Sequence, residues 1–447
     1  MNTSDHAPNS TNTQIEKVGI VICNFNKQDY VLGCIASVLE QTYTDYKVYA
    51  VDNASTDDSA KLIQEQYGDR VTLLVNAENL GGSGGFDRGM REAMKAGHPY
   101  IWCLDNDVLV DENALKALVD YAEAHPEAGM FGSKVYNMDD PDTIQQYGVM
   151  VNLDDFSTTA KHVNEIECGE NPEIEFCNSC ATCSLMVRRE VVEKIGVMPE
   201  DNFIYWDDIE WGYRCHLAGY DIVSIQGSQV LHQQGANKEI VNTFPTYYAW
   251  RNWIHFFNRY LKDEELEKWA DTILHSVFME SYSGLFRDEH VRARAVMAAY
   301  DDALHGVRGK ARDGIIAQID KNHKMLDLTK GVKAICIEEN GFPIRAQRYR
   351  DKILAEYPDV VFTTDSTKPY DVCFSLVDSI FYLEDFSLRK FYVDIDEDIL
   401  ATEDDVLMII NFNYSERAFV FSQKPLFLQL VRELRAKMGI GKEGLCI

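Results

Sequence analysis

Val18-Gly19-Ile20-Val21-Ile22 is an apolar run that is followed at once by the polar stretch Asn24-Phe25-Asn26. A short apolar run with polar residues after it is typical of a strand buried on both faces of a sheet. Similar runs alternate with segments of helical periodicity as far as residue 110, and this alternation predicts an α/β fold with a mainly parallel, doubly wound sheet. The expected strands cover residues 18–22, 46–51, 71–75 and 100–104, and the expected helices cover residues 30–41, 57–67 and 85–96.

Polar side chains stand directly after these expected strands. They are Asn24 and Asn26, Asp52, Asn79 and Asp105. Ligands of open parallel sheets bind beyond the carboxyl ends of the strands. We therefore expect these residues to line one site.

The rest of the chain changes character twice. Residues 246–330 have mainly helical patterns, whereas residues 331–447 alternate short apolar runs with helical segments. The first 17 residues are polar and suggest a flexible tail. The sequence thus predicts a tail at 1–17, a main α/β domain at 18–245, a helical segment at 246–330 and a small α/β domain at 331–447.

The composition limits the classes of function. The chain has 447 residues, with 72 Asp and Glu against 43 Lys and Arg, and a net charge of −29. This balance argues against nucleic acid as a partner, because phosphate backbones are bound by clustered Lys and Arg. An anionic ligand then needs a local device such as a metal ion or oriented backbone N–H groups.

Location is predicted from what the sequence lacks. No apolar run approaches the roughly 20 residues of a membrane span, and the polar start has no signal-peptide core. Eleven irregularly spaced Cys favour a reducing cytosol. We expect a cytoplasmic protein and leave open a peripheral contact with the inner membrane face and a homo-oligomer.

Asp105-Asn106-Asp107 places two carboxylates at the end of an apolar strand. If the chain bends there, both can converge on a hard cation such as Mg²⁺ or Mn²⁺ that keeps positions open for phosphate oxygens. Acidic pairs at strand ends are more often turn residues or helix caps, so the spacing alone does not decide between the two.

Two further strand ends carry candidate nucleotide contacts. Asp52 could accept hydrogen bonds from a base or ribose, or it could cap the next helix. The stretch from Asn79 to Gly89 contains Gly81, Gly82, Gly84 and Gly85 before an expected helix. Such glycines let backbone approach an anion at a helix N-terminus, and a flexible structural loop is the alternative.

An acidic and aromatic segment runs from Tyr205 to Arg214. Trp206 and Trp211 could form a platform for a sugar, with a partly desolvated carboxylate beside them as general base. An exposed helix start, whose acids favour the helix dipole, is the alternative.

Two other patterns suggest metal ligands. His232 follows a short apolar strand and could complete a metal shell with Asp105 and Asp107, although a lone His is more often structural. Cys177, Cys180 and Cys183 resemble half of a zinc site without an evident fourth ligand, so small residues lining a pocket are the preferred interpretation.

These motifs occur in one order and together resemble the family 2 inverting glycosyltransferases. The stretch from Asn79 to Phe86 is most similar to the galactofuranosyltransferase and rhamnosyltransferase branch. The resemblance covers residues 18–257 and implies a GT-A fold in the main domain, a Mn²⁺ or Mg²⁺ cofactor, a UDP- or dTDP-sugar donor, and a glycan or lipid-linked acceptor in cell-surface polysaccharide biosynthesis.

The resemblance also implies roles for individual residues. Asp208 matches the general base, with Asp207 as second choice, and His232 joins Asp105 and Asp107 as metal ligands. Trp206, Glu210 and Trp211 are expected near the acceptor. The implied donor contacts are Phe25, Asn26, Asp52, Asn79, Gly81, Gly82, Arg88, Asp105 and Asn106.

The chain departs from that branch at one notable point. The galactofuranosyltransferases carry a tryptophan pair where this chain has Cys180-Ala181-Thr182, which puts the acceptor and the donor sugar in question. Two alternatives therefore stay open. One is a nucleotidyltransferase that makes sugar nucleotides, and the other is a non-catalytic carbohydrate-binding protein.

Overall fold

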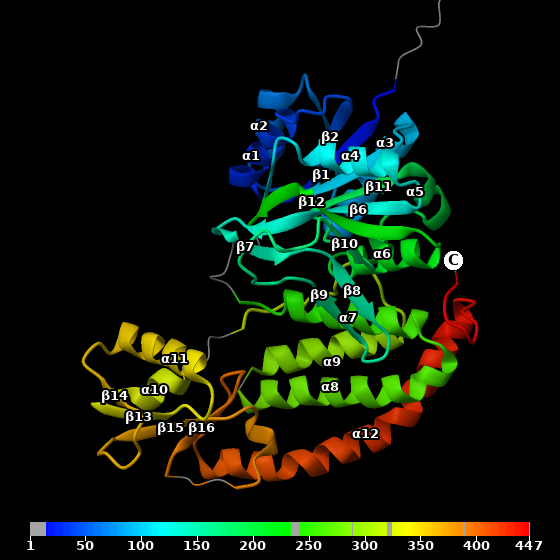
Figure 1. Ribbon diagram of the computed structural model, residues 1–447. Coiled ribbons are helices and arrows are strands. Elements are labelled where there is room, and N and C mark those ends of the chain that lie inside the picture. The colour runs from blue at the N-terminus through cyan, green and yellow to red at the C-terminus, as the bar shows by residue number, and fades with distance from the viewer. Residues whose placement is uncertain are drawn as a thin grey trace, which may run out of the picture. The chain divides into compact units, whose positions relative to one another are not determined.

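The computed structural model describes residues 15–233, 241–287, 289–319, 324–385, 387 and 389–446. Residues 1–14, the bulk of the predicted tail, lie outside the described residues. The chain forms two compact units (Figure 1), and the second contains both the helices and the small sheet that the sequence analysis treats separately. The first unit comprises Met1–Asn237, Arg308–Lys310 and Glu443–Ile447, and the second comprises Lys238–Val307 and Ala311–Lys442.

A large sheet forms the centre of the first unit. Its parallel part has the order β3-β2-β1-β4, and antiparallel β11 joins β4 to β6, which pairs in parallel with β12. The predicted α/β fold is confirmed, and every strand expected before residue 105 is parallel. The strands are β1 (Val18–Asn24), β2 (Tyr46–Asp52), β3 (Val71–Val75), β4 (Tyr100–Asp105), β5 (Val108–Val110), β6 (Ala128–Asn137), β7 (Asp140–Gln146), β10 (Ile174–Cys177), β11 (Ser184–Arg188) and β12 (Asp221–His232). A separate hairpin joins β8 (Val149–Asn152) to β9 (Ser157–Ala160).

Helices cover both faces of this sheet. Along β1, Ile20 and Ile22 pack into the core beneath α1, α2 and α4, whereas Val21 packs into the core beneath α3, α5 and α6. Burial on both faces explains why the opening run is apolar throughout. The helices are α1 (Gln28–Leu39), α2 (Ser59–Tyr67), α3 (Gly81–Ala96), α4 (Ala114–Ala124), α5 (Arg189–Ile195) and α6 (Asp207–Leu217), with the short 3₁₀ helix η1 (Glu200–Asn202) before α6.

The second unit combines packed helices with a small sheet. Helix α9 packs against α7 and α8, and the long α12 packs along α8. Phe286, Phe381 and Phe412 belong to one core that joins these helices to the sheet region. The helices are α7 (Phe244–Tyr260), α8 (Leu266–Phe286), α9 (His290–Leu304), α10 (Lys324–Thr329), α11 (Pro343–Glu356) and α12 (Glu403–Lys437), with 3₁₀ turns η2 (Asp263–Glu265) and η3 (Ile380–Tyr382).

The small sheet has the order β14-β13-β15-β16-β17 and is parallel apart from β17. Among the described residues, no helix is both long and apolar enough to cross a bilayer. The strands are β13 (Ala334–Glu338), β14 (Val361–Thr363), β15 (Val372–Leu376), β16 (Phe391–Val393) and β17 (Ile399–Leu400).

Candidate active site

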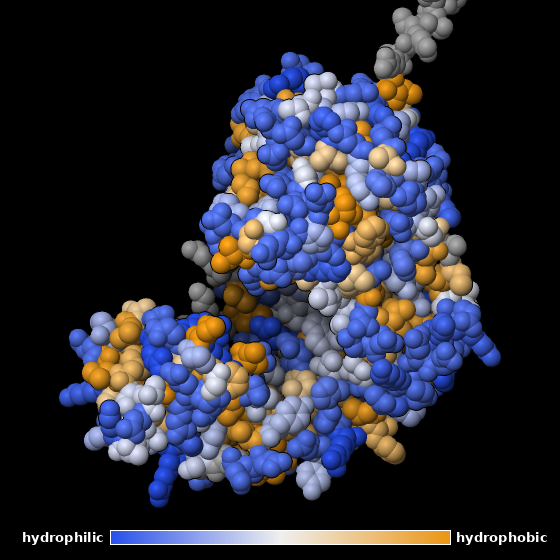
Figure 2. Space-filling model, in the orientation of Figure 1, coloured by the Kyte–Doolittle hydropathy of each residue, from blue (hydrophilic) through white to orange (hydrophobic). Residues whose placement is uncertain are grey.

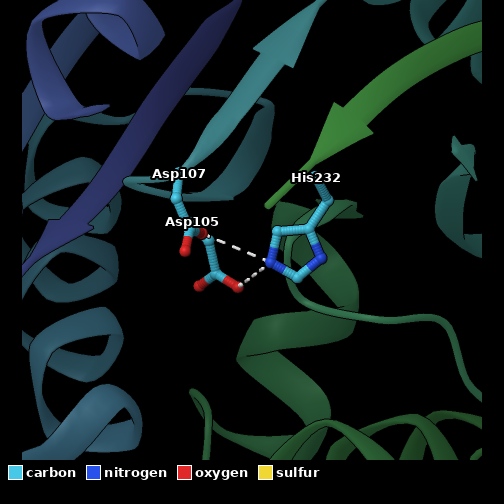
Figure 3. Close-up of side chains that lie close together, drawn as sticks. All are labelled: Asp105, Asp107 and His232. Atoms are coloured by element: carbon cyan, nitrogen blue, oxygen red, sulfur yellow. Dashed lines mark ion pairs between the residues drawn. The ribbon is translucent and has the colours of Figure 1, made fainter. Parts of the chain in front are cut away.

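Asp105, Asp107 and His232 converge at one edge of the large sheet (Figure 3). Asp105 ends β4, Asp107 lies in the turn before β5, and His232 ends β12. Because β5 pairs antiparallel with β12, His232 stands opposite Val108 and therefore beside Asp107. The His232 Nε2 atom is 3.3 Å from Asp107 Oδ1 and 3.7 Å from Asp105 Oδ2. The sequence analysis proposed that these three residues could share one metal ion, and the structure brings them together.

The three side chains fit a divalent cation. One ligand atom from each lies within 4.8 Å of the others, which is compatible with octahedral ligands, whose neighbouring atoms are about 3 Å apart at metal–oxygen distances near 2.1 Å. The other ring nitrogen of His232, Nδ1, is 2.8 Å from the Gln145 side-chain oxygen. A donor bond to that oxygen keeps one proton on Nδ1, so Nε2 is the nitrogen that can bind metal once its own proton is released.

Charge in the cluster also points to a cation. Burial raises the pKa of Asp105 to about 6, and Asp107 contributes to the rise. Burial alone would lower the pKa of His232, but Cys183 and the two carboxylates outweigh it and raise that pKa to about 11. The Lys27 ammonium, 3.2 Å from Asp107 Oδ2, supplies a further positive charge. The ionised forms of Asp105 and Asp107 are therefore stabilised only if positive charge lies next to them, and a divalent cation would supply it.

Asp207 and Asp208 begin helix α6 after a strained loop. Phe203, Tyr205 and Trp206 all have positive φ angles, of 68°, 62° and 63°. Non-glycine residues rarely adopt this conformation, and it recurs at functional sites where the surrounding structure enforces it. The loop fixes the direction in which the first turn of α6 presents its acids.

The two carboxylates of α6 have different surroundings. Asp207 accepts a 2.7 Å hydrogen bond from the Ser83 hydroxyl, which ties α6 to the start of α3. Burial raises the pKa of Asp208 to about 7, with a further contribution from Asp207, against hydrogen bonds from the backbone N–H groups of Ile209 and Thr182. A carboxyl with such a pKa can exchange a proton near neutral pH.

A network of amides links the carboxyl ends of β1, β2 and β4. Asn24 donates to Asp52 at 3.1 Å and accepts from Asn106 at 2.8 Å. Asn53 donates to Asn79 at 3.1 Å and accepts from the backbone N–H of Leu80 at 3.1 Å. Asp52 is also held by the backbone N–H of Ser55. The predicted donor residues Asp52, Asn79 and Asn106 therefore belong to one preorganised edge.

Residues 19–196 match the family described as Glycosyl transferase family 2. The chain carries a family 2 glycosyltransferase domain. Together with the sheet topology, this match confirms the predicted GT-A type of α/β fold. The glycosyltransferase domain contributes Asp105 and Asp107 to the cluster, whereas Asp208 and His232 follow the matched range.

Several curated relatives are glycosyltransferases. Galactofuranosyltransferase GlfT2 of Mycolicibacterium smegmatis is 25% identical over 265 residues, which cover 53% of this chain and 40% of that protein. The N-acetylglucosaminyl-diphospho-decaprenol L-rhamnosyltransferase of Mycobacterium tuberculosis is 27% identical over 239 residues, covering 48% of this chain and 75% of that protein. The matched part thus spans less than half of the GlfT2 protein.

Solved glycosyltransferase structures are more distant. GalNAc-T7 with UDP, GalNAc and Mn²⁺ superposes with a TM-score of 0.45 at 15% identity, covering 58% of this chain and 51% of that one. Residues 1–349 of TarS from S. aureus with UDP-GlcNAc give a TM-score of 0.41 at 15% identity, covering 65% and 81%.

The glycine-rich stretch of the glycosyltransferase domain is not the loop that the sequence predicts, because helix α3 already begins at Gly81. A Cβ atom on Gly81 would lie 2.0 Å from the Phe203 carbonyl oxygen, and one on Gly85 would lie 2.2 Å from the Cys23 sulfur. These glycines therefore allow close packing of α3. Gly82 differs, since a Cβ there would meet no atom within 4 Å.

Two expected acceptor residues are corrected by the structure. Trp211 is completely buried in the core, where its indole N–H donates to the Gly196 carbonyl. Glu210 is 1% exposed and pairs with Arg214. Neither can present a surface to an acceptor, and the two-tryptophan platform of the carbohydrate-binding alternative is lost with them. Trp206 is half-buried and lies in the strained loop.

The remaining predicted residues lie at the periphery or in the core. Phe25 and Asn26 are exposed after β1, and the Asn26 side chain accepts from the backbone N–H of Thr56. Arg88 is exposed on α3. Cys177 and Cys180 are buried with their sulfurs 3.5 Å apart. Among the described residues, only Asp105, Asp107 and His232 form a group suited to a metal ion.

Sequence reasoning missed several residues that complete the site. Gln145 orients His232, Lys27 neutralises Asp107, and Asn53 binds the start of α3. Asn53 directly follows Asp52 in the sequence, and an amide just after a strand end is a usable signal. Gln145 lies 87 residues before His232 in the chain, so only the fold reveals their contact.

Proposed function

We propose that the protein is an inverting, metal-dependent glycosyltransferase. It transfers galactofuranose or rhamnose from a UDP- or dTDP-sugar to a glycan or lipid-linked acceptor. The observation that carries the proposal is the convergence of Asp105, Asp107 and His232 at the carboxyl-end edge of a family 2 sheet, with the half-buried Asp208 near enough for the Asp105 charge to help raise its pKa.

Different residues are proposed to contact different parts of the sugar-nucleotide donor. Asn79 and Asn106 stand on the edge where a nucleoside would bind, with Phe25 and Asn26 exposed beside it for the base. Asp52 is 1% exposed and supports this edge by accepting a hydrogen bond from Asn24. Asp105, Asp107 and His232 hold the cation. When bound, Mn²⁺ or Mg²⁺ counters the charge of the departing diphosphate. Gly82 is the glycine of α3 with room for a ligand beside it. Arg88, which is exposed on α3, is proposed as a further donor contact because of its match to the family motif.

Asp208 is the proposed general base. It accepts the proton of the acceptor hydroxyl while that oxygen attacks the anomeric carbon from the face opposite the diphosphate. The bond from the anomeric carbon to the diphosphate oxygen breaks as the new bond forms, and the diphosphate leaves with the electron pair. A single displacement inverts the configuration. Asp207 is the second choice, because the Ser83 hydroxyl already occupies one of its oxygens.

The substrates are proposed from the printed activities of the relatives. These include a galactofuranosyltransferase and an L-rhamnosyltransferase that acts on a decaprenol-linked diphosphate sugar. Both sugars are consistent with cell-surface polysaccharide biosynthesis, and a lipid-linked acceptor would bring the protein to the cytoplasmic face of the membrane as a peripheral partner.

The proposal is tested by release of nucleoside diphosphate. The full chain would be incubated with Mn²⁺, a decaprenol-type or glycan acceptor, and either UDP-galactofuranose or dTDP-rhamnose. Asp208→Asn is expected to lower kcat at least ~100-fold, because the general base is lost while the shape of the site is kept.

Asp69→Asn is the matched control, since Asp69 is an exposed acid just before β3, at the other end of the strands. It is expected to leave kcat unchanged. The proposal fails if the wild-type chain releases no nucleoside diphosphate from either donor. It also fails if the chain instead releases pyrophosphate from a nucleoside triphosphate and a sugar phosphate, as a nucleotidyltransferase would.

A further inference from the structure

The small sheet of the second unit has its own ligand-binding edge. Its first strand, β13, lies between the next two, with β14 on one side and β15 on the other. Strand order therefore reverses beside β13, and such a switch point opens a crevice at the carboxyl ends of the strands. Asn340 bridges this edge, since its amide donates to the Ser375 hydroxyl and to the Leu376 carbonyl, both at 3.0 Å.

Helix α11 begins at this edge without a side-chain cap. Gly341, with a φ of 93°, turns the chain from β13 towards the helix, and the N-cap residue Phe342 has no side chain that can accept a hydrogen bond. Pro343, the first residue of α11, has no N–H, so the donors of the first turn are the backbone N–H groups of Ile344 and Arg345, which have no partner within the helix and carry partial positive charge. An anion is the ligand that suits such an end.

Arg345 provides an independent sign that an anion belongs here. Its side chain is 9% exposed, and its Nε atom is buried without a hydrogen-bond partner. One terminal nitrogen donates to the Val377 carbonyl at 2.8 Å, and the guanidinium lies 4.0 Å from the centre of the Phe342 ring. A buried guanidinium is normally paired with a carboxylate or phosphate. Among the described residues, Arg345 has no carboxylate partner.

A cavity of about 550 Å³ opens over these groups, a size typical of small-molecule sites. Two apolar side chains at the cavity are unusually exposed, Ile344 at 87% and Ile395 at 66%. The region around α11 shows apolar patches among hydrophilic ones (Figure 2). Arg348 adds a second guanidinium, 3.8 Å from Glu397, which also binds Lys352. The lining residues are Gly341, Phe342, Pro343, Ile344, Arg345, Arg348 and Ile395.

We propose that this cavity is a second ligand site, which binds an organic phosphate that carries an apolar group. The phosphate lies at the start of α11, where the backbone N–H groups of Ile344 and Arg345 can donate to it and the Arg345 guanidinium, which lines the cavity, supplies positive charge. The apolar part covers Ile344 and Ile395. The ligand class includes prenyl phosphates and nucleotides, and the site does not depend on the function proposed for the first unit.

The test is calorimetric titration of the full chain with three probes in the presence of EDTA, which suppresses metal-dependent binding in the first unit. The probes are inorganic phosphate, UMP and geranyl monophosphate. One of the two organic phosphates is expected to bind once per chain and at least ~10-fold more tightly than inorganic phosphate, because only it uses the apolar surface. A preference for geranyl phosphate identifies a lipid source, and a preference for UMP identifies a nucleotide.

Variants locate the binding. Ile344→Asp places a carboxylate in the first turn of α11, where it favours the helix but repels phosphate, and we expect affinity to fall at least ~10-fold. Arg348→Gln should weaken binding by a smaller factor. Arg432→Gln, an exposed arginine on α12, and Asp105→Asn, in the first unit, are controls expected to bind as the wild type does.

The proposal is overturned if no probe binds at about 10 mM, a concentration that reveals even weak sites. It is also overturned if Ile344→Asp binds like the wild type, or if Asp105→Asn abolishes binding.

Discussion

The N-terminal ends of α3 and α11 differ although both helices follow a parallel strand. At α3 the protein itself uses the backbone donors, because Gly81 N–H donates to the Asn79 side chain and Ser83 N–H donates to the Phe203 carbonyl. At α11 the N-cap residue Phe342 offers no side-chain acceptor, and the buried Nε atom of Arg345 has no hydrogen-bond partner. The glycine-rich start of α3 thus serves close packing, whereas the start of α11, which has no such motif, is suited to bind an anion.

The difference shows how each unit can bind a negatively charged phosphate group. In the first unit, carboxylates and His232 gather at the strand ends, and a diphosphate there requires a metal ion between the two sets of negative charge. In the second unit, arginines and helix donors stand at the strand ends and can bind phosphate directly. Similar sheet edges are thus suited to opposite ligands according to the side chains that follow the strands.

Glycine substitutions give the largest expected contrast between the two helix ends. Gly81→Ala combines a left-handed backbone with a contact 2.0 Å from the Phe203 carbonyl oxygen, so we expect a loss of at least ~3 kcal/mol in the free energy of unfolding. Gly341→Ala is strained at a φ of 93° but meets no atom within 4 Å, and should cost about 1–2 kcal/mol.

Gly82→Ala is the matched control, because its Cβ meets open space in a helix. It should be neutral or stabilising by up to ~1 kcal/mol. Urea unfolding of the three variants measures this order. Equal losses at Gly81 and Gly82 would mean that α3 does not pack as described.

A second test concerns the imidazole ring of His232, whose orientation depends on Gln145. Gln145→Ala removes the acceptor that fixes the His232 tautomer. We expect about a 10–100-fold loss of Mn²⁺ affinity, as is usual when the partner of a ligating histidine is removed. Gln146→Ala, the neighbouring residue on β7, serves as control. Phosphate binding at α11 should be unchanged in both variants, and a parallel loss there would contradict the separation of the two sites.

A smaller effect is expected from pH. Burial and Asp207 raise the pKa of Asp208 to about 7, and a general base acts only when ionised. Turnover should therefore fall as pH drops below about 7, approaching tenfold per pH unit well below it. The acidic limb is measured as kcat between pH 5 and 8. A flat profile over that range would remove Asp208 from the role of base.

The sequence predicted the repeating parts of the fold better than the site. Strand β3 has the bounds that its pattern predicts and β2 is one residue longer, because a short apolar run between polar residues leaves a local signal. Helix α3 was placed four residues late, because glycine is a poor helix former and its use here depends on Phe203, over a hundred residues away. Burial of Trp211 was missed for a similar reason, since aromatic residues near acids suit a sugar platform as well as a core.

The central claim is that Asp105, Asp107 and His232 hold one divalent cation. Titration of the full chain with Mn²⁺, followed by electron paramagnetic resonance of the free ion, tests it most directly. We expect one bound ion per chain, and at least ~10-fold weaker binding by Asp105→Asn and by His232→Ala. Binding by both variants with wild-type affinity, or no binding by the wild-type chain, would contradict the claim.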